Sequence, residues 1–138
     1  MIIGWTTGAF DLFHIGHLNI LRSAKALCDR LMVGVSTDEL VFQYKKKHPI
    51  IPFAERIDIV RSVDYVDCAI RREIMNKYEE WKRLKFDVTF VGDDWYQDKK
   101  WKKWETKLLK LNVKIAYLPY TPNQSTTKII KTMIEYGG

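Results

Sequence analysis

Apolar and polar residues follow a regular order along the chain, in which short apolar runs alternate with amphipathic stretches. The apolar runs are four to six residues long and rich in Val, Ile and Leu, which is typical of buried strands. They fall at residues 2–6, 31–35, 65–70, 88–91 and 113–118. The stretches between them repeat apolar residues at spacings of three and four, which predicts helices. We expect these helices at 17–28, from 36–39 onward, at 53–63, at 73–84, in the Lys- and Trp-rich segment after residue 92, and at 126–136.

Strands separated by helices are typical of a parallel sheet, because the chain must cross back over the sheet before each new strand. The nearly continuous apolar character of the runs indicates strands that are covered on both faces. We therefore predict an α/β fold: a Rossmann-like, parallel five-stranded sheet with helices on both faces. Residues 1–138 are expected to form one domain, since they contain neither an internal repeat nor a linker. Ligands of such sheets bind beyond the carboxyl ends of the strands, so functional residues are expected just after each strand.

The composition fits a packed globular domain, with 46% hydrophobic and 13% aromatic residues. No apolar run approaches the roughly 20 residues that cross a bilayer, and the first residues lack the charged region of a signal peptide. Cys28 and Cys68 lie far apart in apolar contexts, and we interpret them as buried free thiols in a reducing compartment. We expect a cytoplasmic protein with no membrane partner.

The formal net charge of +6 predicts an anionic partner, which nucleic acid, a membrane surface or a phosphorylated small molecule would satisfy. Basic residues form two runs, at 45–48 and 99–104. The second run interleaves lysine with tryptophan, a pattern also found in nucleic-acid-binding segments. However, helical spacing places four apolar side chains of this region on one face: Trp101, Trp104, Leu108 and Leu111. The lysines then cover a solvated face, and we expect no nucleic acid partner.

The first post-strand segment contains two of the three histidines of the chain, His14 and His17, where a loop becomes a helix. Gly8 and Gly16 allow the backbone to approach a ligand closely. A helix N-terminus attracts phosphate through its free N–H groups and its dipole, and two imidazoles there can stabilise charge that develops on a phosphorus centre. Half of a zinc site is the alternative. No third His or Cys is suitably placed, so no metal site is predicted.

Two further post-strand segments carry polar residues. Residues 92–95 read Gly-Asp-Asp-Trp, and their carboxylates suit either a helix cap or hydrogen bonds from a base or ribose. Residues 121–128 include the hydroxyls of Ser125, Thr126 and Thr127, which suit either a helix cap or a cradle for the β- and γ-phosphates of a nucleotide. Together with the histidine loop, this segment places two helix N-termini at one sheet edge, which fits a triphosphate between them.

The chain resembles the bacterial glycerol-3-phosphate cytidylyltransferases, within the larger cytidylyltransferase family that also serves phosphocholine and phosphoethanolamine. The resemblance runs nearly end to end. It rests on Gly8–Asp11 with the His14–His17 motif, on Ser36–Glu39, on Arg56 before Val66 and Asp67, on residues 92–95, and on Ser125–Ile129. The histidine motif alone marks a superfamily that includes adenylyl-transferring members. Its combination with the Gly-Asp-Asp-Trp and Ser-Thr-Thr segments favours CTP.

The resemblance implies in-line attack by an acceptor phosphate on the α-phosphorus of CTP, with release of pyrophosphate and no covalent enzyme intermediate. Catalysis is then assigned to His14, His17 and Lys46. Nucleotide binding is assigned to Gly8, Ala9, Phe10, His14, Gly16, His17, Lys46, Asp94, Tyr120, Thr121, Ser125, Thr126 and Thr127. Acceptor binding is assigned to Tyr44, Lys45, Arg56 and Lys77. Mg²⁺ is expected to arrive with CTP. Dimers are common in the family, with the Asp11 region near the subunit contact, so we expect a homodimer.

Three departures from the family pattern concern phosphate or acceptor contacts. Tyr120 stands where the relatives have an arginine, Tyr44 where they have a lysine, and Asp64 where they have a basic residue. Residues 45–47 or Lys128 are candidate replacements for the missing cations. The two tyrosines would also suit a quaternary ammonium head, as in phosphocholine, by cation–π contact.

The expected function is transfer of a cytidylyl group from CTP to a small phosphorylated alcohol, with glycerol-3-phosphate as the first candidate. The product would be a CDP-alcohol for a polymer outside the membrane. The enzymatic alternatives are a cytidylyltransferase for phosphocholine, phosphoethanolamine or another phospho-polyol, and an adenylyltransferase of the same superfamily. A nucleotide sensor and a basic nucleic-acid binder are the non-enzymatic alternatives. They are disfavoured because an inactive relative would more readily have lost His14 or His17.

Overall fold

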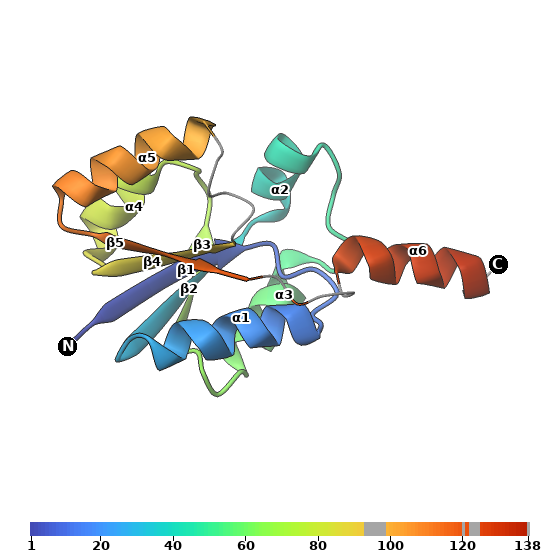
Figure 1. The fold of residues 1–138 in the computed structure, drawn as a ribbon. Helices are drawn as coiled ribbons and strands as arrows, with labels where there is room; N and C mark the ends of the chain where they lie inside the picture. Colours follow the sequence, from blue (N-terminus) through green and yellow to red (C-terminus); the bar gives the residue numbers. More distant parts are fainter. Residues whose placement is uncertain (93–98, 120, 122–124, 138) are drawn as a thin grey trace.

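The computed structural model describes residues 1–92, 99–119, 121 and 125–137. Five parallel strands form one sheet in the order β3-β2-β1-β4-β5 (Figure 1). The strands are β1 (Ile3–Gly8), β2 (Arg30–Ser36), β3 (Cys68–Arg72), β4 (Val88–Gly92) and β5 (Lys114–Leu118). The prediction of a parallel five-stranded sheet is confirmed.

Helices lie on both faces of this sheet, as the sequence predicts. The helices are α1 (Ile15–Ala26), α2 (Asp38–Lys45), α3 (Phe53–Arg61), α4 (Lys77–Leu84), α5 (Lys99–Lys110) and α6 (Thr126–Gly137). Figure 1 shows α1 and α3 on one face, with α4 and α5 on the other. Helix α6 extends away from the body of the molecule.

Each face of the sheet has its own hydrophobic core. On the α1 and α3 side, Leu21 and Val60 are fully buried against the apolar residues of β2. On the α4 and α5 side, Trp5 packs with Phe86 and Leu108. Gly34 of β2 makes room for the indole of Trp5, because a Cβ at this position would lie 2.6 Å from the ring. The two cores hold β1 in the middle of the sheet, and β1 leads into the histidine loop.

The order of the strands reverses at β1. The chain adds β2 and β3 on one side of β1 and then returns to place β4 on the other side. Open α/β sheets bind their ligands at such a switch point, in the crevice outside the carboxyl ends of the two central strands. The segments that begin at this point are the histidine loop after β1 and the segment after residue 92, and the latter lies outside the described residues.

The predicted boundaries were wrong around β3 and α4. The strand was expected at 65–70 but spans Cys68–Arg72, and the following helix begins at Lys77 rather than at residue 73. Tyr65 and Val66 look like strand residues because they pack against the core, although they lie in the turn before β3. Residues 71 and 72 were not expected in the strand, because both are charged. Arg72 is nevertheless buried in the strand, since its guanidinium is paired with Glu80.

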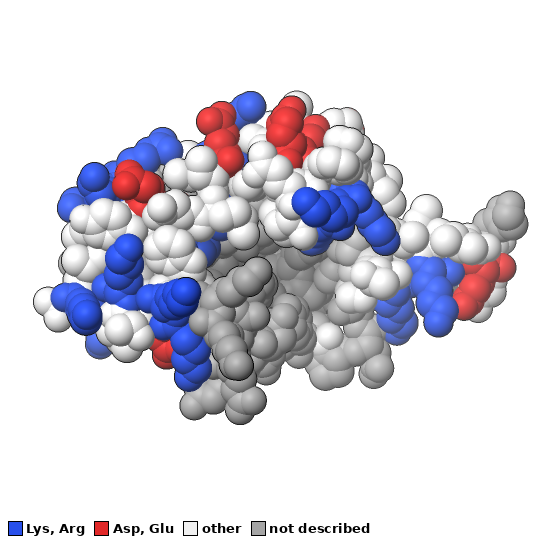
Figure 2. Space-filling view, turned by 90° about the horizontal axis from the view of Figure 1, so that it is seen from above, with Lys and Arg blue, Asp and Glu red and all other residues white. Residues whose placement is uncertain are grey.

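The faces of α5 and the state of the two cysteines agree with the sequence predictions in most respects. Along α5, Trp101 and Leu108 are buried, whereas Lys103 and Lys107 are exposed. Figure 2 shows Lys and Arg side chains gathered at this end of the molecule. Both cysteines are free, but they are half-buried rather than buried. Among the helices of the described residues, none combines the length and apolar character that crossing a membrane would need.

Candidate functional site

The N-terminus of α1 is closed by the two histidines themselves. His14 is the N-cap residue, and its Nδ1 accepts a hydrogen bond from the backbone N–H of Gly16 at 3.0 Å. The backbone N–H of His14 in turn donates to Nδ1 of His17 at 3.1 Å. This is a reciprocal capping box in which imidazoles take the places usually held by a hydroxyl and a carboxylate. The histidines are therefore fixed by the local fold before any ligand arrives.

These hydrogen bonds determine where each ring carries its proton. A neutral imidazole has one donor and one acceptor nitrogen, and in both rings Nδ1 is the acceptor of a backbone N–H. The proton therefore sits on Nε2 of both His14 and His17. The ring centroids are only 3.9 Å apart, and Phe10 and Phe13 pack against His17 with centroids at 5.4 and 5.2 Å. The pair presents two neighbouring N–H donors at the start of a helix.

Both histidines are held in the neutral form. Burial lowers the pKa of His14 below its ordinary value. Burial also lowers the pKa of His17, to about 3, with further lowering from the charge that His14 carries when it is protonated and from the charge of Lys45, and with an opposing effect of Asp11. The pair offers two neutral N–H donors beside the positive end of a helix. This suits a nucleotide phosphate, an anion whose charge is already partly balanced by its own counter-ions.

Asp11 holds the loop that carries the histidines. Its carboxylate accepts hydrogen bonds from the backbone N–H groups of Ile50 and Ile51, each at 2.8 Å. Its backbone carbonyl accepts one from the hydroxyl of Thr126, at the start of α6, at 2.9 Å. The residues on either side, Phe10 and Leu12, have φ angles of 54° and 49°, a left-handed conformation that costs free energy for residues with side chains. The loop is held in this shape by contacts from distant parts of the chain.

The start of α6 lies beside this loop, as the sequence predicts. The hydroxyl of Ser125 accepts a hydrogen bond from the backbone N–H of Lys128 and so acts as the N-cap. Thr121 accepts a hydrogen bond from the side chain of Asn19 on α1 at 2.9 Å, and Thr127 is exposed. Two of the predicted nucleotide-binding residues, Asp94 and Tyr120, lie outside the described residues.

The basic run at the end of α2 begins close enough to the histidines for the charge of Lys45 to act on His17. Lys45 ends α2, and its charge contributes to the low pKa of His17, after the effects of burial and of His14. Lys46 has a left-handed backbone with φ 59° and ends the helix as its C-cap. The side chains of Lys45 and Lys46 are exposed, and Lys45 lies 5.9 Å from the ring centre of Tyr44. Lys45 therefore supplies exposed positive charge near the donor pair.

Gly8 and Ala9 join β1 to the loop. A Cβ at Gly8 would lie 3.1 Å from the ring of Phe10, so the glycine lets this ring fold back against the strand end. Ala9 is buried, and its carbonyl accepts a hydrogen bond from Arg56 at 2.6 Å. Gly16 is buried in the first turn of α1, where its N–H is used by the His14 cap. These residues shape the site through their backbone.

Arg56 does not have the role that the resemblance implies. Its side chain is fully buried, with 0% of its surface exposed. The guanidinium donates to the carbonyls of Ile51, Ala9 and Ser36 and to the carboxylate of Asp38, over distances of 2.6 to 2.8 Å. These contacts leave no surface for an acceptor. The prediction of an acceptor contact is therefore corrected: Arg56 joins the ends of β1 and β2 to the loop before α3.

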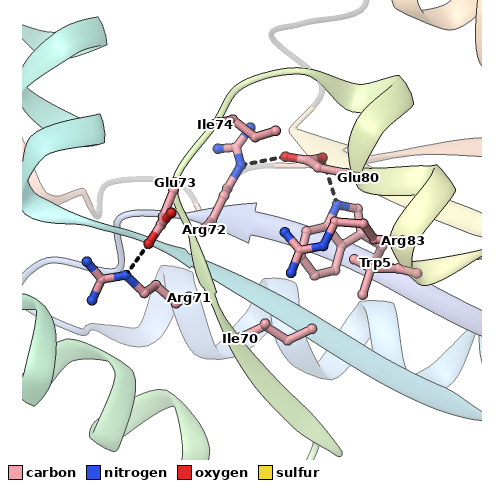
Figure 3. A pocket seen from close by; sticks show the side chains of 9 residues that line it. Trp5, Ile70, Arg71, Arg72, Glu73, Ile74, Glu80 and Arg83 are labelled. Carbon is pink, nitrogen blue, oxygen red and sulfur yellow. Dashed lines mark hydrogen bonds and ion pairs between the residues drawn. The ribbon is translucent and has the colours of Figure 1, made fainter.

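A buried ionic cluster lies at the same sheet edge and was missed by the sequence analysis, apart from Lys77. The carboxylate of Glu80 accepts hydrogen bonds from Arg72 at 2.8 Å and from the indole of Trp5 at 3.0 Å (Figure 3). Lys77 lies 3.6 Å from the same carboxylate and donates to the hydroxyl of Thr7, on β1, at 3.4 Å. The sequence signal was weak, because Arg72 and Glu80 resemble ordinary surface charges until the fold brings them together.

Within the described part of the chain, no three His, Cys, Asp or Glu side chains gather in a way that could hold a metal ion. Mg²⁺ commonly binds through substrate phosphates, water and one or two carboxylates.

A family model described as cytidylyltransferase-like matches residues 5–132. The chain belongs to the cytidylyltransferase-like family. It is 38% identical over 136 residues to the FAD synthase of Archaeoglobus fulgidus, covering 96% of this chain and 98% of that one. It is 37% identical over 129 residues to the glycerol-3-phosphate cytidylyltransferase of Bacillus spizizenii, covering 93% and 94%. The family and these relatives support nucleotidyltransferase activity.

Solved structures agree with the fold. The lipopolysaccharide core biosynthesis protein of Thermoplasma volcanium has a TM-score of 0.73 at 27% identity, covering 90% of this chain and 99% of that one. The pantoate-β-alanine ligase of Francisella tularensis has a TM-score of 0.65 at 18% identity, covering 99% and 70%. The second likeness supports the fold alone. The relatives differ in the reaction that their names give, so the substrates are a separate question.

Proposed function

We propose that this protein transfers a cytidylyl group from CTP to a small phosphorylated alcohol, with glycerol-3-phosphate as the first candidate, and releases pyrophosphate. The observation that carries the proposal is the capped histidine pair at the switch point of the sheet. It combines a helix N-terminus, two Nε2 donors from neutral rings and a nearby lysine run, all beside the N-terminus of α6. Such an arrangement binds phosphate and stabilises charge without forming a covalent bond.

We infer the following reaction from this arrangement. An oxygen of the acceptor phosphate attacks the α-phosphorus, and a new P–O bond forms as the bond to the bridging oxygen of pyrophosphate breaks. The electron pair of the broken bond leaves with pyrophosphate. His14 and His17 donate hydrogen bonds to the oxygens of the α-phosphoryl group, where negative charge is redistributed in the transition state. Lys46 and Lys45 balance the charge of the phosphates, and the hydroxyls at the start of α6 bind the leaving part.

Mg²⁺ is proposed to accompany the nucleotide. It would neutralise the triphosphate and orient the leaving pyrophosphate, bound chiefly by phosphate oxygens and water. The described residues fit this role only as neighbours of the phosphates, since they offer no cluster of protein ligands. Their own part is to hold the phosphates in line and to exclude water from the α-phosphorus.

Adenylyl transfer to FMN is the second candidate, favoured by the relatives. Several of them are named FAD synthase, including those of Pyrococcus abyssi at 36% identity and Archaeoglobus fulgidus at 38%. Their identity to this chain is similar to that of the glycerol-3-phosphate cytidylyltransferase, at 37%. The capped histidine pair would serve either reaction, because it acts on the α-phosphorus and not on the base or the acceptor.

A matrix of substrates tests both candidates. Purified protein is incubated with Mg²⁺ and each of the four nucleoside triphosphates, and each nucleotide is paired with glycerol-3-phosphate, phosphocholine, phosphoethanolamine or FMN. Release of pyrophosphate is measured, and the nucleotidyl product is identified by mass spectrometry. Turnover with CTP and glycerol-3-phosphate supports the proposal. Turnover with ATP and FMN alone replaces it with the second candidate, and a preference for phosphocholine would support the aromatic role of Tyr44. No transfer with any pair, from protein shown to be folded, refutes both.

We also propose that the protein is a homodimer. Exposed apolar side chains on the projecting helix α6 support this: Met133 is 58% exposed, Ile134 71% and Tyr136 86%. Covering such residues is the usual way in which a projecting amphipathic helix is stabilised. Light scattering on the eluate of a size-exclusion column gives the mass directly, and a monomer at all concentrations would contradict the proposal.

A further inference from the structure

A chain of side-chain hydrogen bonds connects α1 to the segment between β5 and α6. Arg22 of α1 donates from Nε to the hydroxyl of Tyr65 at 3.1 Å and from Nη1 to Oδ1 of Asn19 at 3.3 Å. The amide Nδ2 of Asn19 donates to the hydroxyl oxygen of Thr121 at 2.9 Å. Arg22 is exposed, whereas the other three side chains are half-buried. The segment that leads to α6 is thus tied to α1 by a polar side chain to which no role has been assigned so far.

The direction of the bonds between Arg22 and Thr121 is fixed by Arg22. A guanidinium can only donate hydrogen bonds, so the atom of Asn19 that faces it must be the carbonyl oxygen. The NH₂ group of Asn19 then faces Thr121, and this group also can only donate. The hydroxyl oxygen of Thr121 is therefore the acceptor, and its own proton is left for a second partner. Within the part of the chain that the structure describes, this hydroxyl makes no second hydrogen bond.

The hydroxyl of Thr126, at the start of α6, is engaged in the opposite sense. It faces the backbone carbonyl of Asp11 at 2.9 Å, and a carbonyl can only accept, so Thr126 must give its proton to Asp11. The phosphate oxygens of a nucleotide are also acceptors, and they bind to donors. Thr121 therefore has a proton to offer to a phosphate, whereas the proton of Thr126 is used within the protein.

Asn19 holds Thr121 close to the helix terminus of the histidine pair. Residues three and four apart lie on the same face of a helix, so Asn19 lies below Ile15 and Gly16. One turn separates them, about 5.4 Å along the helix axis. Gly16 is the residue whose N–H is bound by the His14 cap. The bond from Asn19 thus keeps Thr121 beside the first two turns of α1, next to the N-terminus that suits phosphate.

We propose that Asn19 is a positioning residue that fixes the hydroxyl of Thr121 as a hydrogen-bond donor to the leaving pyrophosphate of the nucleotide. The inference rests on the proposed function, because it places a nucleoside triphosphate at this site, but it is the same for CTP and for ATP. Arg22 orients the amide of Asn19, and Tyr65 holds Arg22 in place through its hydroxyl and its ring, whose centre lies 5.6 Å from the guanidinium carbon. The contact stabilises the charge that pyrophosphate takes with it when the bond to the α-phosphorus breaks.

Binding of inorganic pyrophosphate tests the inference without any turnover. Asn19→Leu has a side chain of similar size that makes no hydrogen bond. With Mg²⁺ present, isothermal titration calorimetry should show a Kd for pyrophosphate about tenfold higher than in the wild type, as expected for the loss of one hydrogen bond to a charged group. Ser23→Leu is the control, because it places the same side chain at an exposed position of the same helix. Circular dichroism shows whether each variant is folded.

The outcomes of this titration separate the inference from the proposed function. An unchanged Kd in Asn19→Leu, an equal change in Ser23→Leu, or a wild type that binds no pyrophosphate would each overturn the inference. A tenfold change in a protein that transfers no nucleotide would refute the proposed function and leave the contact between Thr121 and pyrophosphate standing.

A double-mutant cycle shows whether Asn19 acts through Thr121. Thr121→Val removes the hydroxyl and keeps the shape of the side chain, and Thr121→Ser keeps the hydroxyl. Asn19→Leu should raise the Kd for pyrophosphate about tenfold in the wild type, but by less than about twofold in Thr121→Val, because the donor is already absent there. Thr121→Ser should bind within about threefold of the wild type. Additive effects of Asn19→Leu and Thr121→Val would overturn the positioning role.

The kinetic constants of the active enzyme give a third readout. In Asn19→Leu, KM for the nucleotide should rise about tenfold while KM for the acceptor stays unchanged, because Thr121 contacts the leaving part and not the attacking group. Asn19→Asp keeps an oxygen for Arg22 but replaces the NH₂ donor by a second acceptor, so that Thr121 must turn its proton towards the new carboxylate. Wild-type KM for the nucleotide in Asn19→Asp, or equal rises of both KM values in Asn19→Leu, would overturn the inference.

Discussion

The neutral state of His17 makes the stability of this protein depend on pH in a way that can be calculated. In the folded protein the pKa of His17 is lowered to about 3, first by burial and then by the charges of His14 and Lys45. In the unfolded chain it returns to the ordinary value of about 6.5. Below pH 6.5 the unfolded state therefore binds a proton that the folded state does not bind, and acid favours unfolding.

The size of this effect follows from the two pKa values. Stability conferred by His17 is fully present above pH 6.5 and is lost as the pH falls towards 3, by about 1.4 kcal/mol for each pH unit. Between pH 7 and pH 4.5 the loss is about 2.5 kcal/mol. Carboxylates add their own pH dependence. One of them is Asp67, whose pKa is lowered by hydrogen bonds from Lys25 and from the backbone N–H of Leu31.

A variant isolates the contribution of His17. His17→Asn keeps an acceptor for the backbone N–H of His14 but cannot bind a proton in this range, whereas the carboxylates remain the same. Free energies of unfolding are measured by urea titration with tryptophan fluorescence, for both proteins at pH 7 and pH 4.5. We expect the wild type to lose about 2.5 kcal/mol more than the variant over this interval. Equal losses, or an NMR titration of the His17 ring near pH 6.5, would refute the account of the site.

Three further outcomes are expected. His17→Ala should lower kcat about 100- to 1,000-fold by removing one donor from the phosphoryl group, while circular dichroism shows an intact fold; near-normal turnover would contradict the catalytic role. Arg56→Met should destabilise the protein by at least about 3 kcal/mol in urea, because it leaves three carbonyls and Asp38 without their buried donor, and a loss below 1 kcal/mol would argue against this network. Gly34→Ala should cost about 1–3 kcal/mol, because the new Cβ would meet the ring of Trp5 at 2.6 Å; thermal denaturation checks this, and an unchanged midpoint would show that the ring can move away.

The sequence predicted those parts of the site that depend on neighbours in the chain. His14 and His17 are three residues apart, and three residues make almost one turn of helix, so a local pattern was enough to place them together. The same holds for Ser125 at the start of α6. The succession of strands and helices along the chain could also be predicted, because strands that are buried on both faces are nearly continuous runs of apolar residues.

The parts that were missed depend on contacts between distant segments. Arg72 and Glu80 come from a strand and a helix, and each looks like a surface charge until both are buried together. Arg56 was given the wrong role, because a sequence motif does not show whether a guanidinium faces a ligand or the carbonyls of its own chain. The boundaries of β3 were misplaced for a related reason, since burial of Tyr65 and Val66 in a turn imitates burial in a strand.

The hydrogen bond from Thr126 to the carbonyl of Asp11 joins residues that are 115 positions apart. A ribosome that synthesises this protein therefore releases the two histidines long before it releases the residue that completes their loop. During that interval the nascent chain contains the capped histidine pair without one of the long-range contacts that hold its loop in shape. The loop is therefore completed late in synthesis, when the start of α6 arrives.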